Sequence, residues 1–216
     1  MGLTSSCMPC YKVFVSSTGV LGVPGGPFSL LLPRSKDFEE FEVLMRILYP
    51  DPVDYITSIG AMDLLWSRLE PAGYMSYITE DPLPGTPTHR VLYQYGLGDA
   101  QVNILGLYAI ARSARAVMFE SNVRCQFLLP DTGQVVTEKL FGFPLLPDDT
   151  TVTQDVVAVG FDCGAPPEPA DNIPPNAATD THEGPRRSPL AQEQMDIFLR
   201  SGEIKNVCGG TCKCTL

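Results

Sequence analysis

Basic residues and long apolar runs are both scarce in this sequence. Its 216 residues include 15 Lys and Arg against 25 Asp and Glu, for a net charge of -10 at pH 7. Phosphate binding depends on Lys and Arg, so this balance argues against a nucleic-acid or anionic-membrane surface. The longest apolar run, "GVLGVPGGPFSLLLP", contains three prolines and four glycines and cannot form a membrane-spanning helix. The opening "MGLTSSCMPCYK" lacks the pattern of a secretory signal.

Histidine is also rare, since His89 and His182 are the only two in the sequence. A catalytic base that moves protons needs access to its substrate and a carboxylate that orients it. His89 directly precedes an apolar run in "PTHRVLYQY", where a polar residue at a strand edge is expected. His182 lies at the end of a long loop, which suits a base better. The alternative for His182 is a solvated loop histidine.

The rest of the composition is that of one globular domain. The hydrophobic fraction is 44%, and a chain of this length can bury a core. The 20 prolines and 19 glycines predict many loops. Segments typical of strands alternate with segments typical of helices, so we expect a single α/β domain over residues 1–216.

The first half of the chain is predicted to contain one strand followed by helices. Residues 11–26 have the composition of a strand that ends in a Gly- and Pro-rich turn. Residues 37–80 are helical in character, with Asp37 predicted as an N-cap and a second helix starting at residue 54. Helical spacing places five apolar side chains of the first helix on one face: Phe38, Phe41, Leu44, Met45 and Leu48.

The second half returns to an α/β pattern. A strand at 90–95 is predicted to lead into a helix at 101–115. The further segments typical of strands are 123–129, 134–141 and 151–161. Residues 162–188 form a proline-rich loop that is too long for a simple connector. A last helix is predicted from Ser188-Pro189 to about Gly202, because proline suits the first helical position and glycine the C-terminal end.

Seven cysteines are clustered mainly at the two ends of the chain. A structural zinc site needs four ligands at close spacings, whereas these clusters lie about two hundred residues apart. Disulfides or unpaired thiols are therefore favoured over a metal site. We expect Cys208 to lie close to Cys212 or Cys214, as a local loop closure, rather than to pair with Cys7 or Cys10.

The stretch "VLYQYGLGDAQV" combines a predicted buried strand, a Gly-Leu-Gly turn and the carboxylate of Asp99. The segment that follows it has a helical pattern. Asp99 has two compatible interpretations, as the N-cap of that helix or as the acid of a catalytic triad. Its place at the carboxyl end of a strand is what the second interpretation requires.

Asp99 and His182 occur in the order acid, then base, as in the doubly wound hydrolases. In those enzymes the acid follows a late strand, and the histidine lies in a loop before the final helix. The separation of 83 residues (182 − 99) leaves room for a helix and further strands between them. If the two form a catalytic pair, a carboxylate oxygen of Asp99 should lie within about 2.6–3.2 Å of an imidazole nitrogen of His182.

Several segments together resemble the C-terminal half of bacterial, exported α/β-hydrolase-fold proteins of the lipase/esterase type. The similar segments are "GVLGVPGGPFSLLLPRSKDF", "YPDPVDYI", "LLWSRLEPAGYMSYI", "DPLPGTPTHRVLYQYGLGDAQV", "SPLAQEQMDIFLRSGEI" and the cysteine-containing tail. The resemblance covers the chain from about residue 19 to the end and is least clear over 117–160.

This resemblance implies an incomplete α/β-hydrolase-like sheet with flanking helices. It assigns Asp99 as the triad acid and His182 as the triad base. Residues 19–26 would be the strand after the nucleophile helix, and residues 28–86 a helical cap-like insertion over the active site. The Pro-rich loop 162–188 would carry the histidine, and residues 203–216 would form a Cys-rich tail. The implied substrate is a small-molecule ester or acyl compound, with no cofactor and no metal.

The nucleophile of this family belongs in a Gly-x-Ser-x-Gly elbow, which the sequence does not contain. The elbow would lie just upstream of "CYKVFVSSTGVLGVPGG", which leaves Ser5, Ser6 and Cys7 as the local candidates. The interpretation is therefore the C-terminal portion of a serine hydrolase that lacks its N-terminal half and retains acid and base. This chain alone is expected to hydrolyse simple esters weakly or not at all.

Two alternatives belong to other classes. One is a non-catalytic α/β-hydrolase-like protein that acts in binding or assembly. The other is a small secreted disulfide-containing domain in which Asp99 and His182 are incidental and lie far apart.

Overall fold

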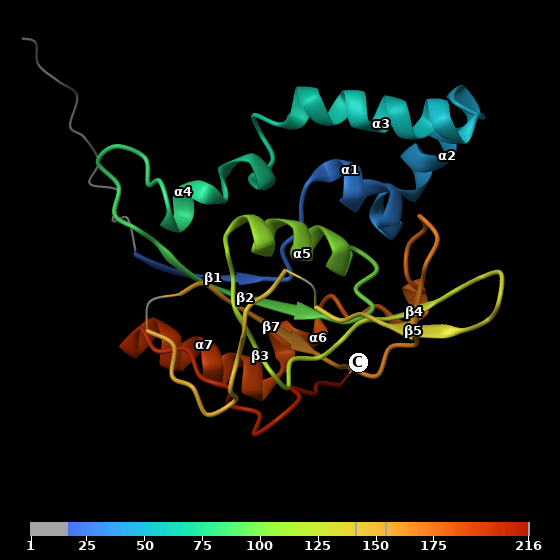
Figure 1. The fold of residues 1–216 in the computed structure, drawn as a ribbon. Helices are drawn as coiled ribbons and strands as arrows, with labels where there is room; N and C mark the ends of the chain where they lie inside the picture. The colour runs from blue at the N-terminus through green and yellow to red at the C-terminus, as the bar shows by residue number, and fades with distance from the viewer. Residues whose placement is uncertain (1–16, 141, 154, 216) are drawn as a thin grey trace, which may run out of the picture.

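The structure is a computed structural model that describes residues 17–140, 142–153 and 155–215. Helices and small sheets alternate in it, so the chain belongs to the α/β class (Figure 1). Its central sheet contains three parallel strands in the order β1 (Thr18–Gly22), β2 (Arg90–Gly96) and β7 (Val157–Phe161). β2 is the middle strand and is buried from Val91 to Gly96, as expected for a parallel sheet that is covered on both faces.

One helix covers each face of this sheet (Figure 1). On one face, Tyr93 and Tyr95 of β2 pack in a single core with α5 (Ile104–Ser113). On the other face, Leu92 packs in a second core with α7 (Pro189–Ser201). The alternation of side chains along β2 therefore assigns successive residues to opposite cores.

The predicted strand at 90–95 and the predicted last helix are both confirmed. α7 has Ser188 as its N-cap residue and Pro189 at the first helical position. It ends at Gly202, whose φ of 74° is left-handed. Both ends of α7 could therefore be predicted from the local sequence. Proline suits the first helical position, and glycine adopts the positive φ at the C-terminal end without steric cost.

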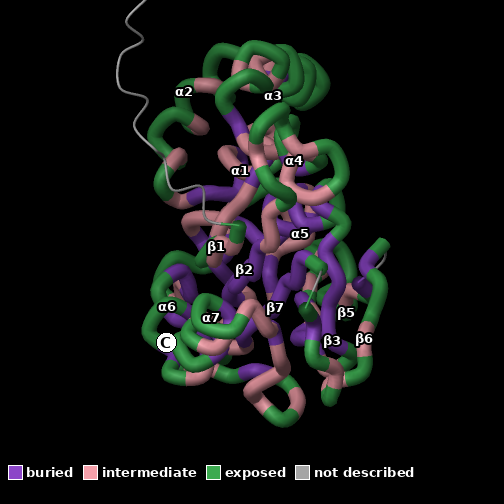
Figure 2. Tube along the Cα trace, turned by 90° about the vertical axis from the view of Figure 1, so that its left-hand side faces the viewer, coloured by how far each residue is buried: buried purple, intermediate pink, exposed green. Residues whose placement is uncertain are grey.

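The chain between β1 and β2 is helical, and its longer helices lie apart from the sheet (Figure 1). Its elements are α1 (Phe28–Leu31), η1 (Leu32–Arg34), η2 (Lys36–Phe38), α2 (Glu39–Leu48), α3 (Pro52–Trp66), η3 (Pro71–Tyr74) and α4 (Ser76–Thr79). The tube in Figure 2 shows α2 and α3 as mostly exposed or half-buried, whereas β2 and β7 of the central sheet are buried.

One sequence-based prediction for α2 is wrong. Asp37 is not its N-cap: Ser35 caps the preceding η2 by accepting a hydrogen bond from Asp37 N, and α2 starts after Phe38 without a side-chain cap. The apolar face of α2 is largely exposed, since Phe41 and Leu48 are 60% and 61% exposed. Amphipathic spacing identified the helix correctly but not what covers it.

Two smaller sheets are formed mainly by the segment in which longer strands were predicted. β3 (Met118–Phe119) pairs with β6 (Leu145–Leu146), and β4 (Gln126–Leu128) lies between β5 (Val135–Thr137) and β8 (Glu168–Pro169). The strands are two or three residues long, and β4 and β5 are shorter than the predicted runs 123–129 and 134–141. The long loop that begins after β7 is likewise not featureless: besides β8 it contains η4 (Ala177–Thr179) and α6 (Gly184–Arg187).

Two disulfides fix the C-terminal tail. Cys208 pairs with Cys212, with their Cα atoms 5.1 Å apart, which confirms the predicted local closure. Cys163 pairs with Cys214 across a sequence separation of 51, a bond that the sequence did not predict. Cys7 and Cys10 lie outside the described residues. In the part of the chain that the structure describes, no helix has both the length and the apolarity needed to cross a membrane.

Candidate functional site

The site begins at the turn that follows β2. Gly98 has a φ of 79°, and a Cβ at this position would collide with the Cβ of Ala165. The Gly98 N–H also donates to Oε1 of buried Glu168 at 3.0 Å. A side chain would be strained and blocked here, so glycine allows the chain to turn tightly and places Asp99 at the carboxyl end of the middle strand.

Asp99 is 2% exposed and uses both carboxylate oxygens. Oδ1 accepts hydrogen bonds from the backbone N–H groups of Gln101 at 2.9 Å and Val102 at 2.7 Å. Asp99 therefore caps a turn, not the helix: α5 starts at Ile104, later than predicted, and Asn103 is its N-cap. The N-cap interpretation correctly predicted that the Asp99 side chain accepts hydrogen bonds from backbone N–H groups. It was wrong about the helix, because α5 is capped by Asn103.

The second oxygen of Asp99 contacts His182. Asp99 Oδ2 lies 2.9 Å from His182 Nδ1, within the range predicted for a catalytic pair, and the imidazole is itself buried. The two residues are 83 positions apart, so tertiary structure brings them together. This contact contradicts the expectation, attached to the third interpretation, that the two side chains lie far apart. A neutral imidazole donating Nδ1–H to Asp99 leaves Nε2 free to accept a proton.

The hydrogen bond to Asp99 raises the pKa of His182 above its ordinary value of 6.5. Burial of the ring opposes this effect because it disfavours the charged imidazolium, and the negative charge of Asp99 then adds to the rise. The imidazole is thus a stronger base than a solvated histidine, which is the property that a general base requires.

Asp180 is part of the site, although sequence reasoning missed it. Its Oδ1 accepts hydrogen bonds from the N–H groups of Ala100 at 2.9 Å and His182 at 3.1 Å. Its Oδ2 accepts from Lys36 Nζ at 2.7 Å and Gln101 Nε2 at 2.9 Å. One carboxylate therefore joins the Asp99 turn, the His182 loop and the helical segment before α2. The only signal in the sequence was its position two residues before His182.

The charge of Asp180 is well stabilised. Burial alone would raise the pKa of this carboxyl, but the hydrogen bonds from Lys36, Gln101, Ala100 and His182 outweigh burial and lower the pKa to about 2. The hydrogen bond between Lys36 and Asp180 also raises the pKa of Lys36. Lys36 is further fixed by its backbone N–H, which donates to Ala100 O at 2.8 Å.

The loop that carries His182 lies directly on the end of β2. Thr181 is fully buried, and a Cβ added to Gly96 would lie 2.7 Å from Thr181 Oγ1. The absence of a side chain at Gly96 therefore lets the loop approach the strand closely. This close packing fixes the residue next to the histidine.

Replacing Asp180 by asparagine is expected to lower the pKa of His182, because Asp180 contributes a negative charge near the ring. The shift should be smaller than that from removing the Asp99 charge, since Asp99 is the main cause of the rise. An NMR titration of the His182 ring protons measures it. Glu183→Gln is the matched control, because Glu183 neighbours His182 in the chain but pairs with Arg186. Equal His182 pKa values in Asp180→Asn and the wild type would contradict this role.

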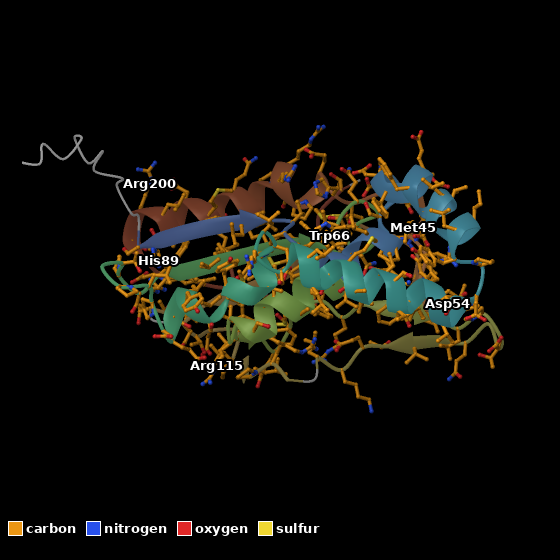
Figure 3. The ribbon with its side chains drawn as sticks, turned by 90° about the horizontal axis from the view of Figure 1, so that it is seen from above. Met45, Asp54, Trp66, His89, Arg115 and Arg200 are labelled. Carbon is orange, nitrogen blue, oxygen red and sulfur yellow. A yellow bond between two sulfur atoms is a disulfide. The ribbon has the colours of Figure 1, made fainter. Side chains whose placement is uncertain are left out.

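The second histidine, His89, is not brought to this pair. His89 directly precedes β2, so the length of that strand separates it from Asp99; Figure 3 shows His89 at one end of the molecule and the α2–α3 region at the other. Ser5, Ser6 and Cys7 lie outside the described residues. No group of three or more His, Cys, Asp or Glu residues within the described ranges is placed to hold a metal ion.

A separate cavity of about 420 Å³ lies at the carboxyl ends of β2 and β7. Leu97, Asp162 and Glu168 line it, but neither Asp99 nor His182 does. Burial raises the pKa of Glu168 against the opposing hydrogen bonds from Gly98 and Asn103. The free Cys125 thiol on the cavity wall also has a raised pKa, chiefly through burial, so it is a poor nucleophile.

Comparison with known proteins gives no assignment, because no family model, curated protein or solved structure matches this chain.

Proposed function

We propose that this chain carries the acid and base of an acyl hydrolase of the α/β-hydrolase type, acting on carboxylic esters or related acyl substrates. The observation that carries the proposal is the 2.9 Å contact between buried Asp99 and His182. In a Ser-His-Asp triad, the carboxylate fixes the imidazole tautomer and stabilises the imidazolium that forms during acyl transfer. The raised pKa of His182 fits that role.

The placement of the two residues in the sheet also supports the proposal. Three parallel strands run in the order β1-β2-β7, with the acid after the middle strand. The histidine follows β7 and precedes the last long helix, α7. This is the chain order of acid and base in α/β-hydrolases. Ligands of open parallel sheets bind beyond the carboxyl ends of the strands, which is where Asp99 and His182 lie.

In this mechanism His182 Nε2 removes a proton from the attacking group and later returns it to the leaving alcohol. Asp99 remains ionised and holds Nδ1–H throughout. The attacking group would be a serine on a strand-to-helix elbow, but the sequence contains no Gly-x-Ser-x-Gly. Ser5, Ser6 and Cys7 are the candidates that the resemblance leaves. Without an aligned nucleophile, the pair has only water to activate.

The chain as written is therefore expected to hydrolyse p-nitrophenyl esters of short and medium acyl chains weakly. An oxyanion-hole donor contributes about 2.7–4 kcal/mol to transition-state stabilisation. A sequence without the Gly-x-Ser-x-Gly elbow that supplies such a donor is therefore expected to react more slowly by orders of magnitude. The residual activity should disappear in His182→Ala and persist in His89→Ala, which removes the only other histidine.

Three results would change this assignment. Equal turnover by His182→Ala and the wild type would overturn the role of His182. No turnover above that of heat-denatured protein would favour a non-catalytic α/β-hydrolase-like binding protein. Robust turnover, with a fluorophosphonate label on Ser5 or Ser6, would show that the N-terminal segment supplies a working nucleophile. In that case the expected weak activity would be wrong and the role of His182 would stand.

A further inference from the structure

In the described part of the chain, three carboxylates accept N–H groups of the turn between β2 and α5. Asp99 accepts two of them from within the turn, and Asp180 accepts the N–H of Ala100. The third carboxylate is Glu168, whose Oε1 accepts the N–H of Gly98 at 3.0 Å. A carboxylate from the long loop after β7 thus fixes the chain on each side of Asp99, because Gly98 precedes it and Ala100 follows it.

The second oxygen of Glu168 holds the far end of the same turn. Glu168 Oε2 accepts a hydrogen bond from Asn103 Nδ2 at 2.8 Å. The other end of the Asn103 amide, Oδ1, accepts the N–H of Leu105 at 3.0 Å and caps α5. One carboxylate therefore connects the residue before Asp99 to the first turn of the helix that follows it.

Glu168 is buried, with only 2% of its surface exposed. A buried carboxylate costs free energy unless polar partners compensate for the lost water. Burial raises the pKa of Glu168, whereas the hydrogen bonds from Gly98 and Asn103 and the positive charge of Arg34 lower it. Each of the two oxygens already accepts a hydrogen bond from the chain. The contacts of Glu168 therefore assign its role to the turn that it holds, although it also lines the neighbouring cavity.

The backbone that carries Glu168 has contacts of its own. Glu168 and Pro169 form β8, which pairs with β4. Directly after Glu168, the buried guanidinium of Arg34 donates to Pro169 O at 3.5 Å and to Ala170 O at 3.3 Å. The N–H of Ala170 also donates to Leu128 O at 3.1 Å. Glu168 is thus fixed independently of the turn, as a group that positions another segment must be.

We propose that Glu168 is a positioning residue that holds the Asp99 turn against the loop carrying His182. Glu168 lies near the start of that loop and Asp180 near its end, so the loop grips the turn on both sides of Asp99. The 2.9 Å contact between Asp99 and His182 depends on where these two carboxylates place the turn. This role rests on the proposed function, in which the pair acts as acid and base.

NMR titration of the His182 ring in the full chain tests this role without requiring turnover. Asn103→Ser keeps the Glu168 charge and a side chain suited to the N-cap, but removes the donor to Glu168. Glu168→Gln places an NH₂ group against Gly98 N–H or Asn103 Nδ2, whichever way its amide turns. In both variants the His182 pKa should fall towards its value in Asp99→Asn, because a displaced Asp99 carboxylate stabilises the imidazolium less.

A double variant separates position from charge. Glu168→Gln/Asn103→Asp reverses the side-chain hydrogen bond, since the Gln amide donates and the Asp carboxylate accepts, and Asp also suits the N-cap. It should return the His182 pKa towards the wild-type value, although position 168 has lost its charge. The charges that chiefly act on His182 are those of Asp99, Arg186 and Asp180, so loss of the Glu168 charge does not account for a fall.

Turnover provides a second readout. Glu168→Gln should lower kcat for His182-dependent hydrolysis of p-nitrophenyl esters by about 10²-fold, the effect of a misplacement of about 1 Å. KM should stay unchanged, since Glu168 acts through the turn. A wild type with no His182-dependent hydrolysis, but with the expected pattern of His182 pKa values, would overturn the proposed function and leave the positioning of Asp99 by Glu168 in place.

The control for a general loss of stability is Cys208→Ala/Cys212→Ala, which removes a disulfide within the C-terminal tail and should leave the His182 pKa unchanged. A wild-type His182 pKa in both Asn103→Ser and Glu168→Gln would overturn the positioning role. So would an equal fall in the disulfide control, or a folded double variant whose His182 pKa is as low as in Glu168→Gln. If Glu168→Gln does not fold, Asn103→Ser decides, because it retains the buried carboxylate and its bond to Gly98.

Discussion

Replacing Cys163 and Cys214 together by alanine is expected to lower the free energy of unfolding by about 4 kcal/mol. The chain-entropy model relates a disulfide's contribution to the length of the loop that it closes. This bond closes a loop with a sequence separation of 51, whereas the Cys208–Cys212 bond closes one of only 4. The same relation gives the shorter loop about 2 kcal/mol. Urea unfolding of the two double variants, monitored by circular dichroism, measures both effects.

Loss of the Cys163–Cys214 bond should also affect the candidate site. A Cβ on Gly184 would lie 2.5 Å from Cys163 Sγ and 3.3 Å from Cys214 Sγ, so the disulfide packs against the start of α6. Gly184 is two residues after His182. Loss of this bond should therefore shift the NMR signals of His182, whereas loss of the Cys208–Cys212 bond should leave them in place. A smaller loss of stability from the Cys163/Cys214 variant than from the Cys208/Cys212 variant would contradict the loop-length argument.

The elements nearest the site were the ones that local sequence predicted best. β2 has a continuous run of strand-forming residues, and α7 has Pro189 at its start and Gly202 at its end. The Asp99–His182 pair followed from chain order and from the position of each residue relative to these elements. The position of each residue relative to a strand or helix can be read from the local sequence, whereas the order of acid and base is a property of the whole chain.

The parts that sequence reasoning missed depend on tertiary structure. Asp180 acts through four partners that come from three separated segments, and no spacing encodes that set. The partner of Cys214 could not be chosen either, because cysteine pairing over long separations is not readable from sequence. The amphipathic pattern of α2 predicted a helix with one apolar face, but a periodic pattern does not specify what covers that face.

Asp99→Asn is expected to have the largest effect on the chemistry of the site. An asparagine can keep contact with the imidazole, but it removes the charge that favours the imidazolium and does not impose the Nδ1–H tautomer. The equivalent change in a Ser-His-Asp triad lowers kcat by about 10⁴-fold. We therefore expect His182-dependent ester hydrolysis to fall to the level of His182→Ala. The pKa of His182, measured by NMR titration, should fall below its wild-type value, because the hydrogen bond to Asp99 is its main cause of elevation.

The same substitution predicts a change in how stability depends on pH. In the wild type, His182 has a folded-state pKa above its ordinary 6.5, so the folded protein binds the proton more tightly than the unfolded chain. The stabilisation of the folded state by the proton on His182 is complete below pH 6.5 and is lost as the pH rises through the folded-state pKa of His182. Asp99→Asn should remove this dependence, which urea unfolding at a series of pH values from 5 to 9 measures. Asp37→Asn, an exposed carboxylate before α2, is the control and should retain it. An unchanged His182 pKa in Asp99→Asn would contradict the pairing, because the carboxylate of Asp99 would then not be the group that sets the basicity of the imidazole.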